Sequence, residues 1–115
     1  MKDRLIEIET MYADEFLEKH GLEIEVIERD TVDTEYTGMR YYAHIKGAVE
    51  IKTGGMLVGA VGNGNSPEQA VHNCIKKISE QLLVVNAYTE NRLEIQAPRL
   101  MFDGGKHVRG ESSVA

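Results

Sequence analysis

The chain has 115 residues, of which 42% are hydrophobic and 28% are charged, and its formal net charge is −6. This length and composition fit one globular domain with its own hydrophobic core, and no apolar run reaches the roughly 18 residues that a membrane-spanning helix needs. The single cysteine excludes an internal disulfide, and the acidic amphipathic start differs from a signal peptide, so we expect a cytoplasmic protein with no membrane partner.

The acidic residues are concentrated in the first third of the chain. Residues 1–35 contain twelve of the nineteen acids and four of the thirteen bases. Such a segment repels nucleic acid, whereas residues 36–115 are close to neutral. The charge distribution therefore disfavours a nucleic-acid partner, while a local basic patch on the second part stays compatible with one.

The first third predicts a helix, a strand and a loop. Residues 3–20 carry apolar side chains at helical spacing, and the glycine that follows is a natural stop, so this segment predicts a helix. Residues 22–29 alternate apolar and charged side chains, which indicates a half-buried strand. The polar, turn-prone residues 30–38 predict a loop.

The middle of the chain predicts two further strands and the turn between them. Residues 39–51 alternate between two faces, and Gly47 marks a bulge or bend. Residues 52–55 end in two glycines and predict a turn. Residues 56–62 are apolar on both faces, which is typical of a strand that is covered on both sides.

A second helix and an extended arm follow. Ser66 is a helix cap, Pro67 fits the first helical position and Gln69 completes a capping box, so residues 67–86 predict a helix. An extended arm runs from about residue 87 to residue 102, and residues 103–115 have the composition of a flexible tail. The predicted fold class is α+β: one domain over residues 1–102, with an α-β-β-β-α order, a three-stranded antiparallel sheet covered by two helices, and a C-terminal extended arm.

This order of elements over roughly residues 3–86 resembles the double-stranded-RNA-binding-domain fold. Members of that family bind RNA through the first helix, the loop after the first strand and lysines at the start of the second helix. Here the first helix is acidic, the loop lacks the Pro-His signature, and the second helix opens with Glu68, with Lys76 and Lys77 two turns later. The resemblance therefore implies the fold and not the RNA site.

The glycine-rich corner before the second helix has a resemblance of its own. The run 62–67, Gly-Asn-Gly-Asn-Ser-Pro, followed by Ala70, is similar to a corner in the regulatory dimer domain of isopropylmalate synthase. That resemblance implies a domain that dimerises and binds a small effector at the interface.

Two groups of residues are candidates for binding a small anionic or nucleotide-like ligand. The corner presents backbone N–H groups at a helix N-terminus, which favours anions; its residues are Asn63, Gly64, Asn65 and Ser66. One face of the second strand combines aromatic and cationic side chains on which a base can stack, namely Arg40, Tyr42, His44 and Lys46. A tight turn and an ordinary sheet exterior are the simpler interpretations. Arginines that could hold such a ligand between subunits are Arg40, Arg92, Arg99 and Arg109.

The sequence predicts no metal centre, cofactor or catalytic residue. The four histidines are scattered and none has the i, i+4 spacing of helical metal ligands. Cys74 lies on the apolar stripe of the second helix, which favours a structural thiol over a nucleophile. The carboxylates of the first helix are explained most simply as a solvated face.

Apolar side chains exceed what a small sheet with one covered face can bury. The surplus suggests a self-association surface formed by Met56, Val58, Ala60, Ile95, Leu100 and Phe102. We therefore expect a small non-enzymatic homo-oligomeric interaction protein, acting on a protein partner as an accessory or inhibitor protein; its size and acidity are similar to those of phage- and prophage-encoded accessory proteins. The alternatives are a binder of a nucleotide-like ligand at the corner or subunit interface, and diverged double-stranded RNA binding.

Overall fold

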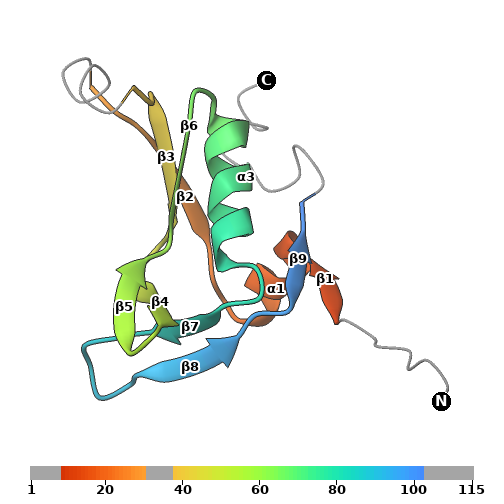
Figure 1. Ribbon diagram of the computed structural model, residues 1–115, viewed down its shortest axis with the longest axis vertical. Coiled ribbons are helices and arrows are strands. Elements are labelled where there is room, and N and C mark those ends of the chain that lie inside the picture. Colours follow the sequence, from red (N-terminus) through yellow and green to blue (C-terminus); the bar gives the residue numbers. More distant parts are fainter. Residues whose placement is uncertain (1–8, 31–37, 103–115) are drawn as a thin grey trace, which may run out of the picture.

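The computed structural model describes residues 9–30 and 38–102. Residues 1–8, which include the start of the expected helix 3–20, lie outside the described residues, as do most of the expected loop 30–38 and the expected tail 103–115. The described chain is an α+β fold (Figure 1). Its elements are β1 (Thr10–Tyr12), α1 (Ala13–Lys19), β2 (Ile24–Glu28), β3 (Tyr41–Ile45), β4 (Val49–Thr53), β5 (Met56–Gly59), β6 (Val61–Gly64), α3 (Pro67–Ile78), β7 (Leu82–Val85), β8 (Leu93–Gln96) and β9 (Arg99–Met101).

A three-stranded antiparallel sheet with the order β2-β3-β6 is present, as the sequence predicted. Helix α3 lies along one face of this sheet (Figure 1). The strands contribute Ala43 and Ile45 to the core, and the helix contributes the stripe Ala70, Val71, Cys74, Ile75 and Ile78. Helix α1 instead packs near β1 and β9, so the sheet is not covered by both helices in the way that we expected.

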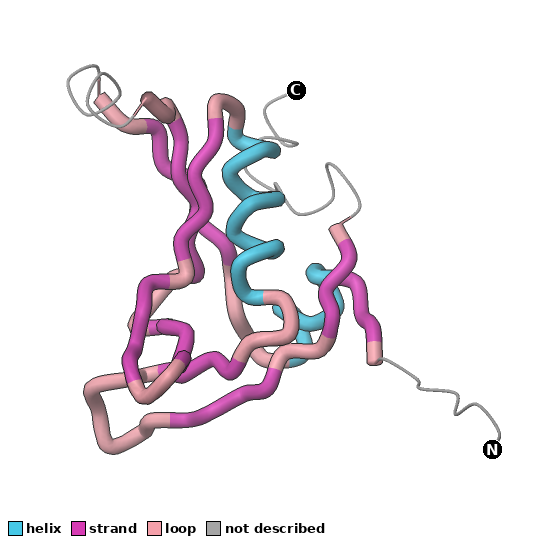
Figure 2. Tube along the Cα trace, in the orientation of Figure 1, coloured by secondary structure: helices cyan, strands magenta, loops and turns pink. Residues whose placement is uncertain are grey.

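The two long strands expected in the middle of the chain are each divided into two. The segment 39–51 forms β3 and β4, separated by Gly47 with φ +89°, and the segment 56–62 contributes to β5 and β6, separated by the buried Ala60. At these bends the β4–β5 hairpin leaves the first sheet (Figure 2) and joins a four-stranded sheet with the order β5-β4-β7-β8. The apolar character of both faces of 56–62 therefore reflects a strand that changes sheets.

The second helix is shorter than the prediction. It begins as expected, with the Ser66 hydroxyl accepting from the Gln69 N–H, but it ends at Ile78 instead of residue 86. Residues 82–85 form β7 between β4 and β8, because these four apolar residues gain two ladders of backbone hydrogen bonds there. The expected arm is likewise built into sheets, as β8 and β9.

Part of the expected first helix is a strand. Thr10–Tyr12 pairs in parallel with Arg99–Met101, and only Ala13–Lys19 is helical within the described residues. The spacing of Tyr12 and Phe16 suggested one helix, yet Phe16 is buried while Tyr12 is 43% exposed. Pairing with a distant strand has overridden the local helical pattern. No helix of the described chain is long and apolar enough to span a membrane.

Candidate functional site

The three-stranded sheet presents one face to α3 and the other to solvent. Two rows of residues that cross the three strands matter here. One row consists of Glu25, His44 and Val61, and the other consists of Ile27, Tyr42 and Asn63. Residues directly opposite each other share a face, and successive rows point to opposite faces. The row Val26, Ala43 and Gly62 lies between them and faces α3. We call the solvent side the open face; it consists of Glu25, Ile27, Tyr42, His44, Val61, Asn63 and Arg29.

The glycines of β6 show how closely α3 covers the opposite side. A Cβ on Gly62 would lie 2.0 Å from the Cys74 nitrogen, and one on Gly64 would lie 2.6 Å from the Ala70 nitrogen. Only glycine allows strand and helix backbones to approach this far. These contacts support the tight-turn interpretation of the glycine-rich corner.

Arg29 is fixed at one end of the open face. Its guanidinium lies 4.8 Å from the centre of the Tyr42 ring and donates to the Asn63 side-chain oxygen and to the carbonyl oxygens of Met39 and Tyr41, at 3.0 and 3.3 Å. Among the described residues, no carboxylate forms an ion pair with Arg29. Sequence analysis missed this residue, although its position two residues after Ile27 continues the alternation of the strand.

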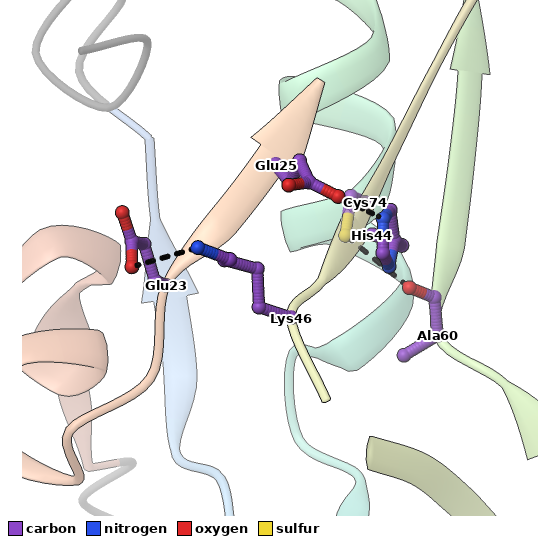
Figure 3. A network of polar contacts seen from close by, with 6 residues as sticks. All are labelled: Glu23, Glu25, His44, Lys46, Ala60 and Cys74. Atoms are coloured by element: carbon purple, nitrogen blue, oxygen red, sulfur yellow. Dashed lines mark hydrogen bonds and ion pairs between the residues drawn. The ribbon is translucent and has the colours of Figure 1, made fainter. Parts of the chain in front are cut away.

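The other end of the open face is acidic. Glu25 is 3.0 Å from His44, and Glu23 is 3.8 Å from Lys46 in the next row (Figure 3). The rings of His44 and Tyr42 are adjacent, with 6.0 Å between their centres. The open face therefore carries Glu25 with its His44 partner at one end, next to the Glu23–Lys46 pair. It carries the Arg29 guanidinium at the other end and an uncharged row between them.

The four residues predicted as one strand face do not all lie together. Tyr42 and His44 belong to the open face, and Lys46 follows the end of β3. Arg40 precedes β3, and its carbonyl oxygen accepts from the Arg29 N–H at 2.7 Å. Its side chain pairs with Glu28 and lies 5.6 Å from the Tyr41 ring centre. The hydrogen bond that Arg40 donates to the Glu28 carboxylate raises the pKa of Arg40.

The corner at the start of α3 uses several of its polar groups internally. The Asn65 N–H donates to the Gln69 side chain at 2.6 Å, and the Gln69 N–H donates to the Ser66 hydroxyl at 3.1 Å. The Asn73 amide donates to the Asn63 carbonyl oxygen at 2.6 Å. Of the predicted corner residues, Asn63 points to the open face, while Gly64, Asn65 and Ser66 form the cap of the helix.

The arginines considered as ligand contacts are not brought together. Arg92 pairs with Glu94 at 3.4 Å, Arg99 lies 3.8 Å from Glu80, and Arg40 pairs with Glu28. Arg109 lies outside the described residues.

The predicted association surface is largely internal. Ala60, Ile95 and Leu100 are buried in the core of the single chain, so the prediction that they form an exposed interface is wrong. Val58 and Phe102 are partly buried against the same core, and Met56 is 66% exposed. The second sheet and β9, which were not expected, provide the missing cover.

Cys74 is fully buried, and its thiol donates to the Ala60 carbonyl oxygen at 3.5 Å (Figure 3). Burial raises its pKa to about 12. A thiol in this state is a poor nucleophile, which agrees with a structural role. Within residues 9–30 and 38–102, no group of three His, Cys, Asp or Glu side chains is arranged to hold a metal ion.

Comparison with known proteins finds no significant match to the chain among protein-family models, curated proteins or solved structures. The resemblances to the double-stranded-RNA-binding domain and to the isopropylmalate synthase regulatory domain therefore stay predictions from sequence.

Proposed function

We propose that the chain is a small non-enzymatic homo-oligomeric interaction protein and that the open face is its association surface. The observation that carries this proposal is the centre of that face. Ile27, Tyr42 and Val61 are half-buried in the single chain, on the side of the sheet away from α3. Covering them with another protein surface removes more of their apolar area from water.

The composition of the open face supports the same assignment. Tyrosine and arginine are enriched at protein interfaces, and charged residues are usually displaced from the centre to the rim. Here Tyr42 lies in the central row, while Glu25 and Arg29 lie on either side of it. An accessory or inhibitory action on a protein target, through the acidic first third of the chain, belongs to the same proposal.

The proposal is tested by sedimentation velocity over a concentration range of about 5 to about 500 µM. We expect the wild-type chain to move from monomer towards dimer as its concentration rises. Ile27→Asp places a charge in the central row and should keep the chain monomeric. Leu93→Asp is the matched control, because Leu93 is 55% exposed on β8, outside the open face. The proposal would be contradicted if the wild-type chain stayed monomeric at every concentration. It would also be contradicted if Leu93→Asp abolished the dimer while Ile27→Asp kept it.

A nucleotide-like ligand is a second candidate, favoured by the contact between Arg29 and Tyr42. A guanidinium stacked on an aromatic ring offers a flat cationic surface on which a base can stack in turn. Thermal unfolding with millimolar nucleotides tests it, because a ligand that binds only the folded chain must raise the midpoint. An unchanged midpoint rejects this candidate.

A further inference from the structure

The open face has a charge polarity that runs along β2 and its continuation. Glu25, Ile27 and Arg29 follow one another on this face. A strand rises about 3.3 Å per residue, so the carboxylate and the guanidinium are rooted about 13 Å apart, with Ile27 midway. The row that crosses the sheet at this midpoint, Ile27–Tyr42–Asn63, carries no charge.

Within residues 9–30 and 38–102, both charged groups have hydrogen-bonding capacity that their contacts do not use. Glu25 contacts His44 through one carboxylate oxygen, and its side chain is 45% exposed. A guanidinium has five N–H donors, and the contacts of Arg29 to Met39, Tyr41 and Asn63 use three of them. Each group can therefore accept a further partner of opposite charge without losing its present contacts.

We propose that two copies stack open face on open face, with their strands antiparallel, so that Arg29 of each copy contacts Glu25 of the other. This inference rests on the proposed function, and it specifies which residues of the two copies meet and that the oligomer is a dimer. A two-fold axis that lies between the sheets, along the central row, exchanges the two ends of the open face. It brings Ile27, Tyr42 and Asn63 next to their own counterparts, and because the contact is isologous, assembly stops at a dimer.

The opposite orientation is disfavoured by the same charges. Stacking with parallel strands requires a two-fold axis along the strand direction, which exchanges the β2 and β6 sides of the sheet. Glu25 would then face Val61 of the other copy and Ile27 would face Asn63, so the charges would lose their partners. The open face consists of seven residues, fewer than the roughly 20–30 per partner of a standard interface, so we expect dissociation in the micromolar range.

Charge exchange tests the pairing directly. Glu25→Lys alone and Arg29→Glu alone each create two repulsive contacts in a homodimer, and each should weaken self-association at least about tenfold. In a one-to-one mixture of the two variants, both contacts are attractive again. Sedimentation should therefore show a heterodimer with a Kd within about threefold of the wild-type value. Failure of the mixture to associate, with a wild-type dimer and both variants folded by circular dichroism, overturns the arrangement but leaves the proposed function standing.

Crosslinking of a central-row residue tests the arrangement even if Arg29→Glu does not fold. Ile27→Cys should be joined to its own counterpart by a short bis-maleimide, whereas Glu68→Cys, on the first turn of α3, should not. The native Cys74 is buried and does not compete for the reagent. Absence of the Ile27→Cys crosslink at a concentration where the wild type is dimeric overturns the arrangement, and a wild type that is monomeric at every concentration overturns both proposals.

Discussion

The contact between Gly62 and α3 determines which face of the sheet is free, and a single methyl group tests it. In Gly62→Ala the new Cβ would lie 2.0 Å from the Cys74 nitrogen and 2.5 Å from the Ala70 carbonyl oxygen. Carbon atoms in proteins rest about 3.5 Å or more from their neighbours, so strand and helix would have to separate by more than about 1 Å. The clashing atoms belong to the helix backbone, so no side-chain rotation relieves the contact.

The cost of this separation follows from what the helix buries. Ala70, Val71 and Cys74 have no exposed area, and all three lose close packing if α3 moves outward. Overpacking a core costs about 1–3 kcal/mol when side chains can adjust, and here backbone must move, so we expect a loss of about 3–5 kcal/mol. That is a large part of the roughly 5–15 kcal/mol that stabilises a typical domain.

Urea unfolding at equilibrium measures this loss, and Gly59→Ala is its control. A Cβ on Gly59, in the adjoining strand β5, meets only a methyl group of Val61 at 3.6 Å, which is ordinary contact. Gly59→Ala should therefore change the free energy of unfolding by about 0.5 kcal/mol or less. If Gly62→Ala fell within about 1 kcal/mol of Gly59→Ala, the close seating of α3 on β6 would be refuted.

Three further predictions concern single residues of the α3 region. Cys74 keeps its proton to a pKa of about 12, whereas an exposed thiol ionises near pH 9, so the free energy of unfolding should fall by about 1.4 kcal/mol per pH unit between pH 9 and pH 12. In urea titrations over this pH range, Cys74→Ala should remove that contribution to the pH dependence. The same pH dependence in the wild type and in Cys74→Ala would contradict the prediction. Glu80 has φ +64°, so Glu80→Gly should be about 1 kcal/mol more stable than Glu80→Ala, which keeps the strain; equal stabilities would show that the turn is unstrained. Ser66→Ala should lower the free energy of unfolding by about 1 kcal/mol, because the helix cap is lost, and Ser66→Asp should lower it much less. Equal losses of unfolding free energy in the two variants would argue against the capping role of Ser66.

The parts of the fold that depend on local chemistry were predictable from sequence. Ser66, Pro67 and Gln69 determine where α3 begins, and alternation locates β2 and β3. The changes of sheet at Gly47 and Ala60 were not predictable, because alternation gives the faces of a strand but not its partners. The end of α3 was missed for the same reason: residues 82–85 are apolar at positions that suit a helix, and only their pairing with β4 and β8 makes them a strand.

The candidate site was predicted in part. Tyr42 and His44 lie on the open face as alternation implied, whereas Arg40 lies just outside β3 and turns to Glu28. Arg29 was missed because its role depends on Tyr42 and Asn63, which come from other strands. The surplus of apolar residues was real in the sequence, but the β5-β4-β7-β8 sheet buries several of them within one chain.

Amide NMR spectra of the wild-type chain, recorded at concentrations from about 1 mM down to about 20 µM, test most directly whether the open face is the contact between copies. Dilution should move the signals of Ile27, Arg29, Tyr42, His44 and Val61 together along one binding curve, and leave those of the exposed Met56, Tyr88 and Leu93 unchanged. Signals that do not depend on concentration, or that move around Met56 or Leu93 instead, would contradict the account.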